Sequence, residues 1–119
     1  MINKVLIADD STFMRQLLRR TLAKGNYQVI AEASDGCEAI SLFKEVSPDI
    51  VLLDLTMPCK DGLSVLKEIK ILDPNAIVVI CSSMGQSKII VEALNYGARD
   101  FIVKPNFNEL IPTLNNLVC

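Results

Sequence analysis

The stretch from Asp49 to Pro58, DIVLLDLTMP, constrains the fold more than any other part of the chain. Residues 50–55 are all Ile, Val or Leu except for one acid, Asp54, near the end of the run. A run this apolar is typical of a strand in a parallel sheet that is covered on both faces. A carboxylate is costly to bury there, so we expect Asp54 at the carboxyl end of the strand. In open α/β sheets this is the edge where ligands bind, although a lone aspartate could equally cap a turn.

Further short apolar runs alternate with amphipathic segments along the rest of the chain. The predicted strands, besides the central one, cover residues 4–8, 28–33, 76–81 and 100–103. Apolar residues at helical spacing predict helices in between, with Phe13, Leu17 and Leu18 on the inner face of the first and Ile89 and Ile90 on that of the fourth. Asp35 with Glu38 predicts a capping box. Pro112 indicates that the last helix either bends or begins later than a cap at Asn106 suggests.

This alternation predicts one α/β domain over residues 1–119. Five parallel strands would carry five helices on two faces, because each crossover between parallel strands is right-handed and needs a helix. The natural strand order for five such units is 2-1-3-4-5, the flavodoxin-like order.

The composition excludes several classes of function. A net charge of −2 provides no basic face for nucleic acid. No window reaches the roughly 18 to 20 apolar residues of a membrane span, and the N-terminus has no secretory signal, so we expect a cytoplasmic protein. The absence of His removes the usual general base. The four cysteines, Cys37, Cys59, Cys81 and Cys119, match no metal spacing, and we expect reduced thiols, with Cys81 packed in the core.

Polar side chains follow four of the predicted strands, at the point where each strand ends. They are Asp9 and Asp10, Asp54, Ser82, and Lys104. Parallel strands would bring them to one edge of the sheet, where two like charges about 4 Å apart repel by about 4 kcal/mol at an effective dielectric constant of 20. Such a cluster of acids calls for a cation, and hard oxygen ligands suit Mg²⁺. The chemistry that fits is phosphoryl transfer to a carboxylate, with a metal, a lysine and a hydroxyl around the phosphoryl oxygens.

Four stretches together resemble response-regulator receiver domains, in particular those that stand alone in chemotaxis. They are VLIADDSTFMR, DIVLLDLTMP followed by Asp61 and Gly62, VVICSSMGQ, and GARDFIVKP. Each stretch is weak by itself, but the four in order are highly specific. The resemblance implies a signalling module that promotes its own Mg²⁺-dependent phosphorylation and dephosphorylation and is not an enzyme in the usual sense. It also implies a histidine kinase as phosphodonor, an output protein such as a flagellar motor switch component, and a phosphatase.

The resemblance also assigns roles to individual residues. Asp54 would accept the phosphoryl group, Lys104 would bridge to one of its oxygens, and Ser82 would follow it. Asp10, Asp54 and the backbone carbonyl of Thr56 would bind Mg²⁺, with Asp9 holding it through a water. Phe101 would be the switch aromatic on the output face, which is built from the fourth helix, the fifth strand and the fifth helix. Pro105 is expected after a cis peptide bond.

Four positions in or near these motifs need comment. Ser83 stands where the family usually has Ala or Gly, so which serine responds is open, although the place of Ser82 at the end of its apolar run favours Ser82. Phe101 lacks the hydroxyl of the common Tyr, and Asn106 stands where an apolar aromatic is frequent. Met84 offers no acid or amide to orient water, so we expect a slowly hydrolysed acyl phosphate.

Other functions compete with a chemotaxis regulator. The same receiver could belong to a DNA-binding regulator that dimerises through its fifth helix. A nucleotide or flavin binder of the same fold is disfavoured because DDSTFMR has no glycine for a phosphate loop. A hydrolase with an aspartate nucleophile is disfavoured because D-L-T lacks a second acid two residues after Asp54.

Overall fold

The computed structural model describes residues 2–83 and 86–118. Five parallel strands form one sheet in the order β2-β1-β3-β4-β5, which confirms the predicted order. The strands are β1 Asn3–Ala8, β2 Tyr27–Ala33, β3 Ile50–Leu53, β4 Ile77–Ser82 and β5 Asp100–Val103. The helices are α1 Thr12–Leu22, α2 Gly36–Val46, α3 Gly62–Leu72, α4 Ser87–Asn95 and α5 Leu110–Val118. In the described residues, no helix is both long enough and apolar enough to span a membrane.

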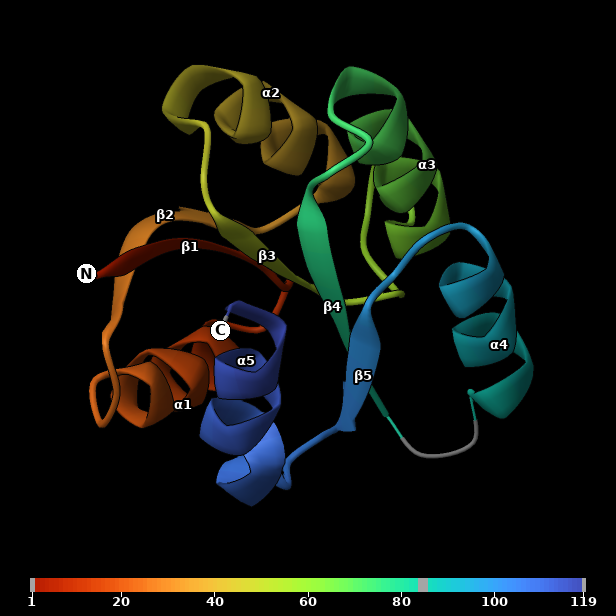
Figure 1. Ribbon diagram of the computed structural model, residues 1–119. Coiled ribbons are helices and arrows are strands. Elements are labelled where there is room, and N and C mark those ends of the chain that lie inside the picture. The colour runs from red at the N-terminus through yellow and green to blue at the C-terminus, as the bar shows by residue number, and fades with distance from the viewer. Residues whose placement is uncertain (1, 84–85, 119) are drawn as a thin grey trace.

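The sheet separates two apolar layers, because successive side chains of a strand point to opposite faces. In Figure 1, α1 and α5 lie on one face of the sheet, and α2 and α3 lie on the other. Ile50 and Leu52 of β3 pack in the layer that contains Leu18 of α1 and Leu114 of α5. The alternate residues of β3, together with the buried residues of α2, α3 and α4, form the other layer. The interiors of β1, β3 and β4 are therefore covered on both faces, as their unbroken apolar runs predict, whereas the outer strands β2 and β5 are less buried.

Local capping explains where several helices begin. The side chain of Asp35 accepts a hydrogen bond from the amide of Glu38 at 2.8 Å, and Glu38 in turn accepts one from the amide of Ser34 at 2.7 Å. This confirms the predicted cap of α2. A 3₁₀ turn, Phe107–Glu109, precedes α5. Pro112 thus lies in the first turn of α5, where a missing N–H removes no helical hydrogen bond, so the later start is the correct alternative.

Two predicted core positions are wrong. Phe13 is 62% exposed and Ile89 is 40% exposed. Phe13 belongs to the first turn of α1, which follows Asp9 and Asp10 at the edge of the sheet and so extends beyond the strand residues that could cover it. The inner face of α4 is narrower than predicted, with Ile90 and Ala93 as its buried residues.

Candidate functional site

The carboxyl ends of four strands meet at one edge of the sheet, and they carry the polar residues predicted there. Backbone hydrogen bonds hold the residues that follow these strands: Asp54 N donates to Ala8 O at 2.9 Å, and Lys104 N donates to Ser82 O at 2.7 Å. The peptide bond between Lys104 and Pro105 is cis, as expected. Gly62 allows the segment after β3 to turn closely, because a Cβ atom there would lie 2.2 Å from the carbonyl oxygen of Asp54. These backbone contacts position Asp54 and Lys104 at this edge of the sheet.

Three carboxylates converge at this edge. Asp9, Asp10 and Asp54 each offer an oxygen, and these oxygens all lie within 4.8 Å of one another. Asp9 and Asp54 are buried, with 1% and 5% of their surface exposed, whereas Asp10 is exposed. One oxygen of Asp9 accepts a hydrogen bond from the amide of Ser11 at 2.9 Å, which places it at the start of α1. Buried like charges this close need a positive partner.

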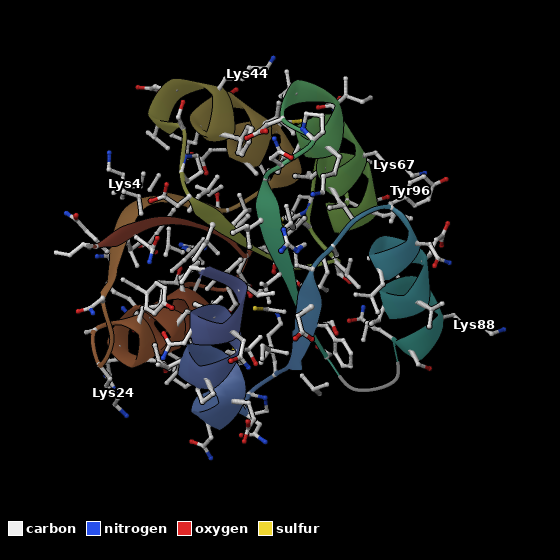
Figure 2. The ribbon with its side chains drawn as sticks, viewed as in Figure 1. Lys4, Lys24, Lys44, Lys67, Lys88 and Tyr96 are labelled. Atoms are coloured by element: carbon white, nitrogen blue, oxygen red, sulfur yellow. A yellow bond between two sulfur atoms is a disulfide. The ribbon has the colours of Figure 1, made fainter. Side chains whose placement is uncertain are left out.

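Lys104 provides that partner from the end of β5. Its Nζ atom lies 2.8 Å from Oδ2 of Asp9 and 3.3 Å from Oδ1 of Asp54, and its side chain is 10% exposed. The surroundings differ from those of Lys4, Lys24, Lys44 and Lys88, which Figure 2 shows directed outward at the periphery of the molecule. Burial alone would lower the pKa of Lys104, but the hydrogen bond and charges of Asp9 and Asp54 outweigh burial and raise this pKa. The lysine is therefore a fixed positive charge.

Asp54 is in an unfavourable place for an ionised carboxyl group. Removal from water raises its pKa, and the neighbouring charge of Asp9 raises it further. The charge of Lys104, its hydrogen bond and the Thr56 amide, 3.4 Å from Oδ1, act in the opposite direction without cancelling the shift. Asp54 is thus a poorly hydrated carboxylate with a stronger tendency to bind a proton, a metal ion or another electrophile.

Ser82 at the end of β4 has an unused hydroxyl group. It is fully buried, and its Oγ has no hydrogen-bond partner, the only such buried side-chain atom found in residues 2–83 and 86–118. Buried polar atoms are nearly always paired, so an unpaired one in a site is a candidate ligand donor. Ser83 is exposed. The burial supports Ser82 over Ser83 as the serine that faces the site. Met84, which was predicted to affect hydrolysis of the acyl phosphate, lies outside the described residues.

The sequence did not reveal a side chain that joins the two loops beside the site. Nε2 of Gln86 donates to the hydroxyl oxygen of Thr56 at 3.0 Å, and Oε1 of Gln86 accepts from the amide of Ser83 at 3.0 Å. Thr56 follows β3 and Ser83 follows β4, so Gln86 connects the segments on which the predicted phosphoacceptor and serine lie. Only its place in the stretch VVICSSMGQ could have drawn attention to it.

An apolar groove of about 370 Å³ runs between α4 and β5. Its lining is formed by Ser83, Gln86, Ser87, Ile90, Val91, Leu94, Phe101 and Val103. Phe101 is 39% exposed and contributes to this groove on the face where the switch aromatic is predicted. The groove begins at Ser83 and Gln86, so it adjoins the loop that follows Ser82.

The cysteines correct one prediction. Cys37 at the start of α2 and Cys59 between β3 and α3 form a disulfide, although reduced thiols were expected. The two residues are 22 positions apart, and their Cα atoms are 6.0 Å apart, a distance that only the packing of α2 against the β3–α3 segment creates. Cys81 is a free, buried thiol, as predicted, and burial raises its pKa to about 12.

Comparison with known proteins identifies the class that this fold and site define. Residues 5–115 match the family described as response regulator receiver domain, and the chain belongs to this family. It is a CheY-like receiver domain of a two-component response regulator. It is 47% identical over 105 residues to the chemotaxis protein CheY of Bacillus subtilis, covering 88% of each chain. It is 49% identical over 102 residues to CheY of Thermotoga maritima, covering 86% of this chain and 85% of that one.

A solved structure agrees with the fold. The crystal structure of the CheX-CheY-BeF3-Mg²⁺ complex from Borrelia burgdorferi has a TM-score of 0.92 and 34% sequence identity with this chain. The alignment covers 98% of this chain and 90% of that one.

Proposed function

We propose that residues 1–119 form one receiver domain that accepts a phosphoryl group on Asp54 from a histidine kinase. The observation that carries the proposal is the surroundings of Asp54. Its buried carboxylate lies 3.3 Å from the Lys104 ammonium and beside the carboxylates of Asp9 and Asp10. The unpaired hydroxyl of Ser82 ends the neighbouring strand.

The transfer uses one nucleophile and two donors. A carboxylate oxygen of Asp54 attacks phosphorus, and the bond from phosphorus to the imidazole nitrogen of the donor breaks, with its electron pair leaving on the imidazole. Lys104, whose pKa is raised, stays protonated and attracts one phosphoryl oxygen. The hydroxyl group of Ser82 donates a hydrogen bond to another phosphoryl oxygen. Because Lys104 is already held beside Asp54, it stabilises the developing charge with little reorganisation, whereas Ser82 moves toward the phosphoryl group as it is transferred.

The same residues fit a divalent cation. Three carboxylates face one ammonium group, so the cluster keeps an excess of negative charge. We propose that Asp9, Asp10, Asp54 and the backbone carbonyl of Thr56 hold Mg²⁺, because such hard oxygen ligands suit this ion. When bound, Mg²⁺ would neutralise charge on the transferred group. The B. burgdorferi relative, whose complex contains BeF3 and Mg²⁺, supports this choice.

The output is proposed to act through the groove between α4 and β5. Movement of Ser82 toward a phosphoryl group on Asp54 would shift the loop that carries Ser83 and so change one end of the groove. Phe101 would adjust its ring in response. The CheY relatives favour a cytoplasmic role in chemotaxis, with a CheA-like histidine kinase, a flagellar motor switch component as target, and a phosphatase. The domain would promote its own phosphorylation and dephosphorylation.

Acetyl phosphate tests the assignment directly. Attack by Asp54 on its phosphorus would release acetate and leave an acyl phosphate on the protein. We expect intact-mass spectrometry to find one added phosphoryl group with Mg²⁺ present and almost none when Mg²⁺ is chelated. Peptide mapping after borohydride trapping should place the group on Asp54.

Three variants provide the comparison. Asp54→Asn should abolish the modification, whereas Asp73→Asn, which changes an exposed carboxylate after α3, should leave it intact. Lys104→Met should keep its fold, as measured by circular dichroism, but should be phosphorylated much more slowly. Phosphorylation of Asp54→Asn to the level of the unchanged protein would refute the proposal.

A further inference from the structure

The disulfide links the phosphoacceptor loop to a neighbouring helix. Cys59 lies in the segment 54–61 between β3 and α3, and Cys37 lies in the first turn of α2. We propose that these two cysteines form a redox-sensitive pair, which reversibly fixes this segment to α2 and thereby tunes the adjacent site. The substrates of the pair would be dithiols, which open the bond, and small disulfides such as oxidised glutathione, which close it.

The surrounding backbone holds the two cysteines together independently of the bond between their sulfur atoms. The amide of Gly36 donates to the carbonyl of Pro58 at 3.2 Å, and the Lys60 amide donates to the same carbonyl at 2.8 Å. The contact is so close that a Cβ atom on Gly36 would lie 1.9 Å from the carbonyl oxygen of Lys60. After reduction these contacts would keep the thiols near each other, so the bond could form again without a conformational search.

The pair is accessible, in contrast to the other described cysteine. Cys37 and Cys59 are both exposed, whereas Cys81 is buried and its thiol has a pKa raised to about 12 by burial. Exposed disulfides are the class that thiols reduce readily, and a buried thiol with a high pKa is inert. Disulfides in a reducing compartment usually serve catalysis or redox sensing. If the domain is cytoplasmic, as proposed above, a bond of this kind fits the second use.

A dithiol reduces the bond between Cys37 and Cys59 in two exchange steps. One thiolate of the reductant attacks a sulfur of the pair and forms a mixed disulfide, and the other cysteine leaves as a thiolate. The second thiolate of the reductant then attacks its own mixed-disulfide sulfur and releases the remaining cysteine. The reductant becomes a cyclic disulfide, and two electrons and two protons end on Cys37 and Cys59.

The pair is coupled to the site through a short piece of backbone. Thr56 lies three residues before Cys59, its amide contacts Asp54, and its hydroxyl contacts Gln86. Cys59 has φ 70°, a left-handed conformation that is unfavourable for a residue with a side chain, so its surroundings must hold it. Removing the cross-link would let residues 56–60 sample more conformations. If the Thr56 carbonyl is a Mg²⁺ ligand, as proposed above, the metal would then have to order this segment and would bind more weakly.

The test compares oxidised and reduced protein over residues 1–119 with a Cys119→Ser change, so that the buried Cys81 is the only cysteine outside the pair. The protein is equilibrated in glutathione buffers, alkylated and analysed by peptide mass spectrometry. Reduction is done in metal-free buffer because the Asp35 carboxylate lies within 4.8 Å of both sulfurs and the reduced trio could hold a contaminating cation. We expect Cys37 and Cys59 to change together with the buffer potential, and Cys81 to stay unlabelled. A pair that stays oxidised in millimolar dithiol while the protein is folded would overturn the inference.

Two further measurements test the coupling. Reduction should speed hydrogen exchange at the amides of residues 56–60 and weaken Mg²⁺ binding, measured by calorimetry, by about threefold or more. Cys37→Ser should reproduce the reduced behaviour in both buffers. Equal exchange and equal Mg²⁺ affinity in the two states would overturn the coupling. Absence of Mg²⁺ binding in both states would refute the proposed metal site, and the coupling to it, whereas hydrogen exchange and alkylation would still decide whether the pair is redox-sensitive.

Discussion

Ile50–Leu53 form strand β3, and Asp54 directly follows them in the same segment. Burial stabilises the apolar side chains of the strand but disfavours the charged form of Asp54. The four strand residues are at most 1% exposed and pack against apolar layers on both faces. Burial of each such side chain stabilises the fold by about 1.5 to 3 kcal/mol. Asp54 is almost as buried, at 5%, but burial raises its pKa, which means that its charged form is held at a cost. Apolar burial in the strand thus offsets the cost of keeping Asp54 charged at the carboxyl end, where the phosphoryl transfer is proposed.

The largest expected effect is a cavity in the strand interior. Leu52→Ala should lower the free energy of unfolding by about 2 to 5 kcal/mol, because Leu52 is 1% exposed and a packed layer relaxes only in part around the missing atoms. Urea denaturation at a pH of about 7 measures the change. The folded fraction should still accept a phosphoryl group, since no atom of the site is removed.

An exposed leucine-sized residue provides the control for that substitution. Ile71 is 80% exposed on α3, so Ile71→Ala should change the free energy of unfolding by no more than about 0.5 kcal/mol. A loss of phosphorylation in folded Leu52→Ala protein would show that interior and edge are not separable in the way the comparison states.

Opening the disulfide should have the next largest effect, because this bond ties the edge to the helical layer. Cys37 and Cys59 are separated by 22 positions. A cross-link that closes a loop of about this length stabilises a protein by about 3 kcal/mol in the chain-entropy account. Denaturation of the unchanged protein with and without dithiol measures the loss. Dithiol should cause no further loss in Cys37→Ser, and a reductant effect of equal size in that variant would assign the loss to another cause.

Removing the charge of Asp54 should raise the free energy of unfolding instead of lowering it. The folded-state pKa of Asp54 is raised above its unfolded value, so this group favours folding fully at low pH and loses that contribution as the pH rises through the raised pKa. Asp54→Asn removes the ionisation, and we expect a gain of the order of 1 kcal/mol at a pH of about 7 in metal-free buffer. The gain should shrink as the pH falls toward about 4, and a constant gain would contradict an electrostatic cause.

The sequence predicted the interior and the edge because both depend on patterns that a parallel sheet imposes. Apolar runs predicted the strands. The polar residues that follow four of these runs, which are Asp9, Asp54, Ser82 and Lys104, were predicted to meet at one edge of the sheet. The disulfide was missed because the distance between Cys37 and Cys59 depends on how a helix packs against a loop, which no local pattern encodes. Gln86 was missed for the same reason, since its partner Thr56 is 30 residues away. Phe13 was misplaced because helical periodicity does not show where the sheet beneath a helix ends.

The smallest effect concerns exposed charges on β2, the outermost strand on one side of the sheet. Glu32 on β2 is paired with Arg15 at 3.1 Å and with Arg19, and its side chain is 29% exposed. The hydrogen bond from Arg19 is the main reason that the pKa of Glu32 is lowered, against the effect of burial. A lowered pKa stabilises the fold above the ordinary carboxyl pKa, and this contribution is lost as the pH falls through the lowered value. Glu32→Gln should therefore cost less than about 1 kcal/mol at a pH of about 7, since solvent screens such pairs.

Salt distinguishes this pair from the buried cluster. The effect of Glu32→Gln should shrink when the salt concentration is raised to about 1 M, where screening acts over about 3 Å, whereas the gain from Asp54→Asn should persist because the Asp54 carboxylate is shielded from solvent. Glu45→Gln, at an exposed position on α2, is the matched control and should have no measurable effect on unfolding. If salt removed both effects equally, the electrostatic difference between the strand ends and the exposed edge would not hold, and the raised pKa of Asp54 would need a cause other than its removal from water.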